Sequence, residues 1–166
     1  EDVKIKDKNN NLFINSNEMN YDVINQTITS KSDSEIFDNF GNVYKVKEFE
    51  YSIEKKVIKL NQLNAFDADK NSFIVDLAYM DLTTKELLAK DVNLNFKITE
   101  NSENEPRLKG RSLINDENNT IVKKGTFTFC KKREKCPPWE MSAEEIRHDK
   151  KKKTINYKNA SLKIYD

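Results

Sequence analysis

The chain has 166 residues, of which 36% are apolar and 34% are charged, so it is long enough for one domain with a substantial core. The 29 Lys and Arg nearly balance the 28 Asp and Glu, and a formal net charge of +1 gives no overall positive field to attract nucleic acid. No stretch has the ~20 apolar residues of a membrane-spanning helix. We therefore predict a single domain over residues 1–166 without a nucleic-acid partner.

From residue 12 onward, apolar and polar residues alternate with the period of a β-strand that buries one face. The clearest run is residues 92–98, and similar alternation occurs at 44–53, 73–79 and 127–129. Residues 142–147 contain a Ser-x-x-Glu pattern that could cap a short helix. The repeat described next favours a strand there instead, so we predict an all-β fold.

A hairpin unit recurs at intervals of 29 to 34 residues. In each copy an apolar or ring residue is followed by Asp, Asn or Ser, then by five mostly polar residues and an aliphatic residue. The copies are Tyr21-Asp22 with Ile28, Tyr51-Ser52 with Ile58, Met80-Asp81 with Leu87, Ile114-Asn115 with Ile121, and His148-Asp149 with Ile155. Each copy predicts a strand, a polar turn and a returning strand. Such polar hairpins must stack and share one apolar interior to be stable.

The apolar pattern also shifts by one residue inside several units. The shifts fall between Val46 and Phe49, between Ala143 and Ile146, and between Tyr157 and Ala160. A one-residue shift indicates a bulge or corner, and corners at matching places would fold a long sheet into two facing walls with an apolar crease.

Turns must form with only 3 Gly, so we expect many of the 21 Asn and 13 Asp to occupy left-handed turn positions. The polar residues 100–106 are expected to form a long loop.

Alternation places one set of side chains toward the crease, although packing in a closed core is an equally good explanation for each of them. The set is Phe49, Tyr51, Ile58, Leu60, Phe73, Val75, Leu77, Val92, Leu94, Phe96, Phe127 and Phe129.

The sequence offers little for catalysis. His148 is the single histidine, and its place in the hairpin repeat indicates a ring packed at a strand end rather than a general base. A zinc site would need His148, Cys130 and Cys136 to converge with a carboxylate, and their spacing fits no usual zinc pattern. We therefore expect neither an enzyme nor a metal or other cofactor.

The most specific motifs lie near the C-terminus. They are Gly-Thr-Phe-Thr-Phe-Cys at 125–130, Cys-Pro-Pro-Trp at 136–139, Ile-Arg-His-Asp at 146–149 and Asn-Ala at 159–160. This region resembles the end of the periplasmic domain of the LptD family, outer-membrane lipopolysaccharide-assembly proteins also called organic solvent tolerance proteins. The hairpin units resemble the repeats of the wider OstA-like superfamily, which includes LptA and LptC. The resemblance covers nearly the whole chain and is specific over residues 125–164.

The resemblance implies an open β-jellyroll, or β-taco, whose crease receives the acyl chains of lipopolysaccharide in the periplasm of a Gram-negative bacterium. It implies a location at the periplasmic face of the outer membrane, with a C-terminal β-barrel beyond this chain. The implied partners are lipopolysaccharide, an LptA-like bridge protein that adds to a strand edge near Leu12 to Ile14, the protein's own barrel, and its plug lipoprotein LptE.

The family also implies a role for the cysteines. Cys130 matches a family cysteine that forms a disulfide with the barrel, in keeping with an oxidising periplasm. Cys136 departs from the family pattern, so the two cysteines could pair with each other or each reach into the barrel.

Two other functions fit the same hairpins. A soluble LptA-like bridge for lipopolysaccharide would share the repeats but not the cysteine and tryptophan segment. A structural β-repeat protein of a bacterial surface would carry no lipid and would not require Cys130, Cys136 and Trp139 at these positions. A β-sheet hydrolase with paired carboxylates is a more distant alternative.

Overall fold

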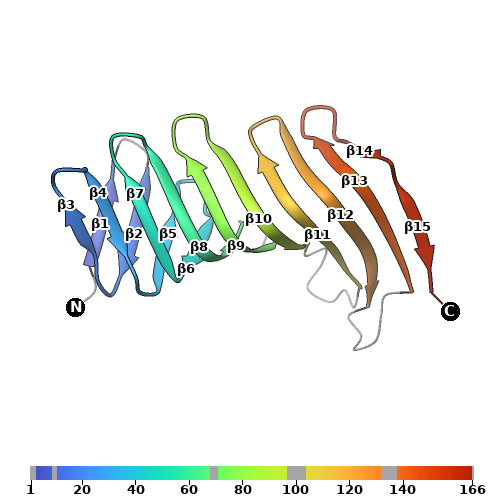
Figure 1. Cartoon of the computed structure of the whole chain (residues 1–166), viewed down its shortest axis with the longest axis horizontal. Coiled ribbons are helices and arrows are strands. Elements are labelled where there is room, and N and C mark those ends of the chain that lie inside the picture. Colours follow the sequence, from blue (N-terminus) through green and yellow to red (C-terminus); the bar gives the residue numbers. More distant parts are fainter. Residues whose placement is uncertain (1–2, 9–10, 68–70, 97–103, 132–137, 166) are drawn as a thin grey trace.

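The computed structural model describes residues 3–8, 11–67, 71–96, 104–131 and 138–165. In this part of the chain, fifteen strands form one antiparallel sheet that is not closed into a barrel (Figure 1), which confirms the predicted all-β class. The strands are β1 (Val3–Asp7), β2 (Leu12–Ser16), β3 (Asn20–Asp22), β4 (Thr27–Ser30), β5 (Ser34–Phe37), β6 (Val43–Val46), β7 (Glu48–Ser52), β8 (Val57–Phe66), β9 (Ser72–Asp81), β10 (Glu86–Asn95), β11 (Asn104–Asn115), β12 (Asn119–Lys131), β13 (Trp139–Asp149), β14 (Thr154–Lys158) and β15 (Ser161–Ile164).

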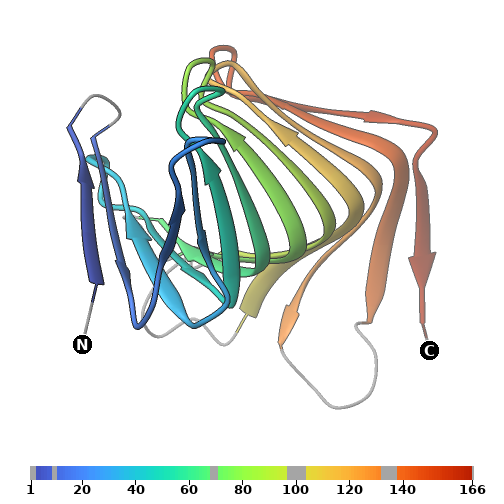
Figure 2. The ribbon, with the colours of Figure 1, turned by 60° about the vertical axis from the view of Figure 1, so that its left-hand side comes forward.

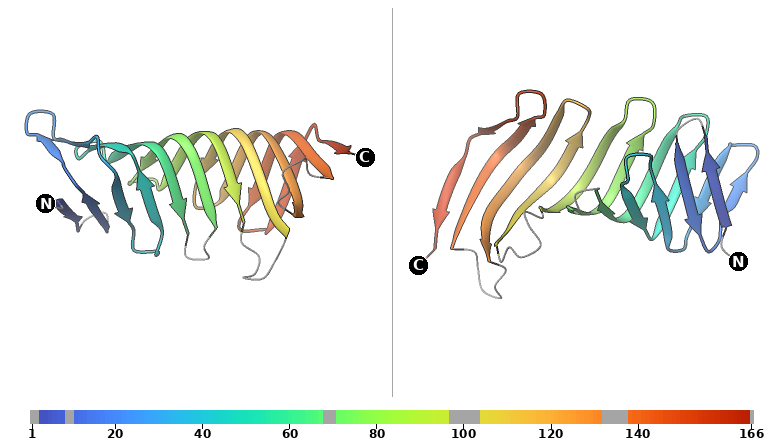
Figure 3. Two further views of the ribbon diagram at one scale, coloured as in Figure 1. Left: turned by 90° about the horizontal axis from the view of Figure 1, so that it is seen from below. Right: turned by 180° about the vertical axis from the view of Figure 1, so that it is seen from behind.

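The sheet folds over into two walls, and the long strands β8 to β13 run through both of them (Figures 1 and 2). Shorter strands complete each wall, since β6 and β7 both pair with β8, and β14 and β15 both pair with β13. We call the side with β3, β4, β7 and β14 the hairpin wall, because it ends in the five predicted hairpin turns. The side with β1, β2, β5, β6 and β15 is the opposite wall. Views from below and behind show the same succession of strands along the trough (Figure 3).

The line along which the sheet bends from one wall into the other follows one row of residues across neighbouring strands. The row comprises Lys47, Gln62, Asp76, Asp91, Arg111, Lys124, Glu144 and Asn159. On every second strand the row residue has a left-handed backbone, with φ of 50° at Gln62, 54° at Asp91, 49° at Lys124 and 50° at Asn159. The strand register is the same on both sides of the row, so the residues bend the sheet without shifting the pairing. The predicted corners are therefore confirmed.

Small side chains allow the walls to approach each other at the corner. On each of β9 to β13, one inward residue next to the corner is small and the other is larger and branched. The pairs are Ala78 with Val75, Ala89 with Val92, Gly110 with Leu113, Gly125 with Val122, and Ala143 with Ile146. A Cβ on Gly110 would lie 2.2 Å from Cγ1 of Val122, and one on Gly125 would lie 2.6 Å from Cδ1 of Ile146. A side chain at either position would therefore force Val122 or Ile146 to shift.

Aspartates fix the hairpin turns by accepting backbone hydrogen bonds. The Oδ1 atom of Asp81 accepts from the backbone N–H groups of Thr83 and Thr84 at 2.7 and 2.9 Å. Asp22, Asp116 and Asp149 do the same in their turns. These backbone hydrogen bonds lower the pKa of all four carboxyl groups.

Asn and Asp are expected to hold the left-handed positions of the turns, but most of the hairpin turns have another residue type there. The hairpin turns place Gln26, Lys56, Lys85 and Lys153 there. Asp begins the turn instead, where its side chain can accept backbone N–H groups.

Two further expectations need correction. The segment Leu12 to Ile14 is not an edge, because β2 pairs with β1 on one side and β5 on the other, which leaves β1 as the N-terminal edge of the opposite wall. Residues 104–106 of the expected loop are the beginning of β11, paired with β12, while 100–103 lie outside the described residues. Residues 142–147 belong to β13, as predicted.

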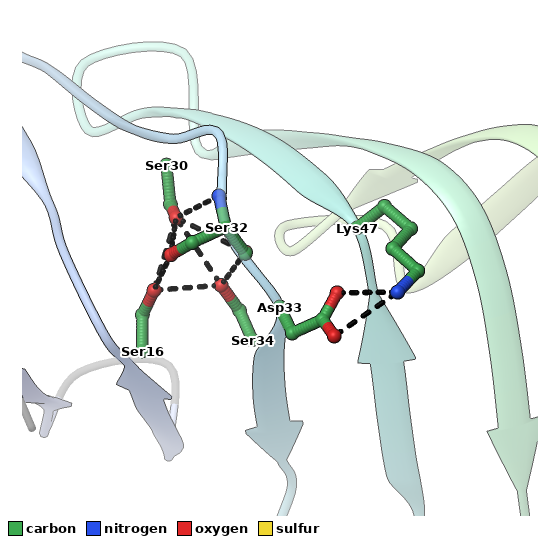
Figure 4. A network of polar contacts seen from close by, with 6 residues as sticks. All are labelled: Ser16, Ser30, Ser32, Asp33, Ser34 and Lys47. Atoms are coloured by element: carbon green, nitrogen blue, oxygen red, sulfur yellow. Dashed lines mark hydrogen bonds and ion pairs between the residues drawn. The ribbon is translucent and has the colours of Figure 1, made fainter.

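A buried serine cluster lies where β2, β4 and β5 approach the corner (Figure 4). Ser16, Ser30 and Ser34 are each at most 3% exposed. Ser34 Oγ donates to Ser16 Oγ at 2.8 Å, and Ser16 Oγ lies 2.9 Å from Ser30 Oγ, so the hydroxyls satisfy one another. The ion pair of Lys47 with Asp33, at 2.8 Å, lies beside the cluster on the exposed side.

Candidate functional site

An apolar cavity of about 480 Å³ lies between the two walls and extends from β6 to β14. The opposite wall contributes Phe73, Leu94, Phe96, Leu108 and Phe127, and the hairpin wall contributes Leu87, Leu113, Val122 and Ile146. The volume is within the range of pockets that hold small organic ligands, about 300–1,000 Å³. The arrangement suits an apolar chain.

The interior is closed at the N-terminal end and open at the C-terminal end. Ile14 on β2 and Ile58 on β8 are fully buried. Every residue of β14 and β15 is exposed, and Ile164 reaches 73%. The exposed side chains include Ile155 and Tyr157, which line the cavity. An apolar ligand would therefore meet open apolar surface at the C-terminal strands.

Two side-chain contacts join the hairpin wall to the opposite wall. The Tyr51 hydroxyl on β7 donates to the Asp7 carboxylate on β1, 44 residues away in sequence. The Lys85 ammonium lies 5.9 Å from the centre of the Phe40 ring, which joins the β9–β10 turn to the β5–β6 turn. The first contact bridges the walls where the core is closed, and the second bridges them farther along, at β9 and β10, whose residues Phe73, Leu87 and Leu94 line the cavity.

Tyr44 lines the same cavity from β6. Its hydroxyl donates to Oδ2 of Asp38 at 3.0 Å. Burial, followed by the negative charge of Asp38, raises the Tyr44 pKa far above its usual value. The phenol therefore stays neutral as part of the cavity wall.

The predicted crease residues fall into distinct groups. Phe73, Leu94, Phe96 and Phe127 line the cavity. Another group is 3% exposed or less and forms closed core: Phe49, Tyr51, Ile58, Leu60, Val75 and Val92. Phe129 is 40% exposed, on the same face of β12 as Phe127.

Leu77 does not face inward, contrary to expectation. It pairs with Asn61 and Lys90, whereas its neighbour Ala78 is fully buried. The corner at Asp76 changes which face of the strand points inward. The two-residue period of a strand therefore does not extend from Val75 to Leu77.

Sequence analysis missed Asn115 and Thr120, which line the cavity beside His148. The predicted repeat aligned Ile114 with His148 and the first residues of the other units, but Ile114 faces outward and pairs with Leu88 and Ile121. The missed signal is the turn aspartate. If the fourth unit is aligned on Asp116 instead of Asn115, Asn115 takes the inward position.

Cys130 belongs to β12, and Cys136 lies outside the described residues, so their disulfides remain predictions. In the described part of the chain, no group of three or more His, Cys, Asp or Glu side chains is placed to hold a metal ion. Likewise, none of the described residues forms a helix long and apolar enough to cross a membrane.

No protein-family model matches the chain, and no curated protein matches it significantly.

Proposed function

We propose that this domain binds the acyl chains of lipopolysaccharide in its cavity and passes the lipid toward an outer-membrane barrel, at the periplasmic face of that membrane. The observation that carries the proposal is the apolar cavity between two walls, closed at the N-terminal strands and open at β14 and β15. A globular core of ordinary design would cover these apolar side chains. Here they stay exposed along one end.

Transfer through such a cavity needs no catalyst. Burial of each methylene stabilises the bound chain by about 0.8 kcal/mol, and a neighbouring apolar surface of similar quality can accept the chain at little cost. The described lining residues come from both walls, so many contacts share the binding energy. No single cavity residue is expected to be essential.

The free strand edges support the proposed partners. In the described part of the chain, β1 and β3 each pair on one side only, and both lie at the N-terminal end of the sheet. An LptA-like bridge protein would add a strand to one of these edges. The C-terminal edge, β14 and β15, would face the protein's own barrel with its plug lipoprotein LptE.

Site-specific photocrosslinking to lipopolysaccharide tests the proposal. A photoreactive residue at Leu94, inside the cavity, is expected to capture lipid, whereas one at Asn93 is not, because Asn93 pairs with Ile74 and Lys109 on the outer face of the same strand. Capture at Leu94 alone supports a lipid-carrying cavity.

If neither site captures lipid while the domain is folded and the bridge protein is supplied, the proposal is wrong. The domain would then be better explained as a structural β-repeat. Equal capture at both sites would indicate nonspecific adsorption and would also contradict the proposal.

A further inference from the structure

A row of side chains near the hairpin turns is mostly apolar or aromatic, but three consecutive members that line the cavity are polar. Strand register places the row directly across neighbouring strands from β3 to β14. Its members are Tyr21, Ile28, Tyr51, Ile58, Met80, Leu87, Asn115, Thr120, His148 and Ile155. The three consecutive polar members, which we call the rim cluster, are Asn115, Thr120 and His148. All three line the cavity.

The rim cluster presents hydrogen-bonding groups toward the cavity. Thr120 Oγ1 donates to Asn115 Oδ1 at 2.7 Å. That bond leaves the Asn115 amide N–H groups as donors and the Thr120 oxygen as an acceptor. Among the described residues, no hydrogen bond is found to the Asn115 amide nitrogen or to the His148 ring. A ligand with several hydroxyl groups matches this mixture of donors and acceptors.

The charges around the cavity argue against a phosphate bound directly at the rim cluster. Among the described lining residues there is no Lys or Arg, while the Asp67 carboxylate lies in the lining of the opposite wall. Asp67 accepts hydrogen bonds from the backbone and side-chain nitrogens of Asn71, at 2.8 and 2.7 Å. Lys150, close to His148 in sequence, donates to the backbone carbonyl of Asp116 and is absent from the lining. A phosphate here would have no cationic partner among the described lining residues.

We propose that the rim cluster binds the sugar hydroxyls of a glycolipid head group, while one of its acyl chains lies in the cavity below. The inference depends on the proposed lipid-binding function and adds to it that the rim cluster contacts the hydroxyl groups of the head group rather than its phosphates. The amide of Asn115, the hydroxyl of Thr120 and the imidazole of His148 would each contact the sugar.

Displacement of a bound fluorescent dye tests this selectivity. The domain is loaded with N-phenylnaphthylamine, an apolar dye without a polar head group. The competitors are dodecyl maltoside and dodecyl phosphate, which have the same chain, both below their micelle concentrations. Wild type is expected to bind the maltoside at least about tenfold more tightly than the phosphate, the effect of one or two hydrogen bonds.

Three substitutions remove the rim cluster while nearly keeping side-chain size: Asn115→Leu, Thr120→Val and His148→Leu. The combined variant is expected to lose the preference for maltoside and to bind the dye as wild type does. Asn156→Leu is the matched control, because Asn156 lies on the exposed outer face of β14, paired with Arg147. It should change neither affinity.

The outcomes separate the two proposals. If the dye does not bind folded wild type, the lipid-binding function itself is wrong. If the dye binds but wild type does not prefer the maltoside, or if the rim variant keeps that preference, the rim-cluster inference alone is overturned. A circular dichroism spectrum that matches wild type excludes misfolding as the cause of a lost preference.

Discussion

Gly110→Ala tests whether the corner is as tightly packed as the structure indicates. The added methyl group would lie 2.2 Å from Cγ1 of Val122 and 3.3 Å from the backbone oxygen of Lys123. The first distance is far below van der Waals contact, so either Val122 or the backbone must move. Overpacking of this kind reduces the free energy of unfolding by about 1–3 kcal/mol. For a domain of this size, each kcal/mol lowers the melting temperature by about 2–4 °C.

A second substitution shows whether the clash is the cause. Val122→Ala alone leaves a hole in the core and is expected to cost about 2 kcal/mol. In the double variant, the methyl group of residue 110 occupies part of that hole, so the combined loss should be smaller than the sum of the single losses by about 0.5–3 kcal/mol. Urea unfolding of wild type, both single variants and the double variant measures this difference. Additive losses, or a Gly110→Ala protein as stable as wild type, would refute the explanation.

Two further predictions concern the turns and the serine cluster. The pKa of Asp81 is lowered by the backbone N–H groups of Thr84 and Thr83, so its contribution to stability is present above the unfolded-state pKa and decreases as the pH falls toward the lower folded-state pKa. In Asp81→Asn the side chain can still accept these hydrogen bonds but no longer titrates. The urea midpoint of this variant should therefore fall less between about pH 6 and about pH 3 than the midpoint of wild type. A fall as large as that of wild type would show that Asp81 does not contribute to the pH dependence of stability. Ser34→Ala removes the hydroxyl 2.8 Å from Ser16 Oγ and should cost about 1–3 kcal/mol of unfolding free energy by the same urea assay, whereas Ser161→Ala, on exposed β15, should cost almost nothing. Equal effects of the two serine substitutions would show that the buried cluster adds no stability.

The position of the cavity follows from the way the fold is built. At the N-terminal end, β1, β2, β5 and β6 bring the opposite wall against the hairpin wall, and Tyr51 and Asp7 join them. At the C-terminal end, β14 and β15 pair only with β13 in the described part of the chain, so their exposed apolar side chains have no strand beyond them. The same sheet therefore provides a stable core at one end and an apolar binding surface at the other.

The sequence by itself determined the local features of this protein. Alternation predicted the strands, the repeated turns predicted the five hairpins, and one-residue shifts such as that between Val46 and Phe49 predicted the corner. These features depend on residues close together in the chain, where the two-residue period of a strand and the preference of Asp for turns act directly.

Only the tertiary structure decided which inward residues form closed core and which line the cavity. Val92 and Leu94 have the same pattern in sequence, yet Val92 is buried at the corner and Leu94 lines the cavity. The structure also brought Asn115, Thr120 and His148 into one row, and it placed Leu77 outside. These outcomes depend on the distance between the walls and on strand register, which are set by packing between residues far apart in the chain.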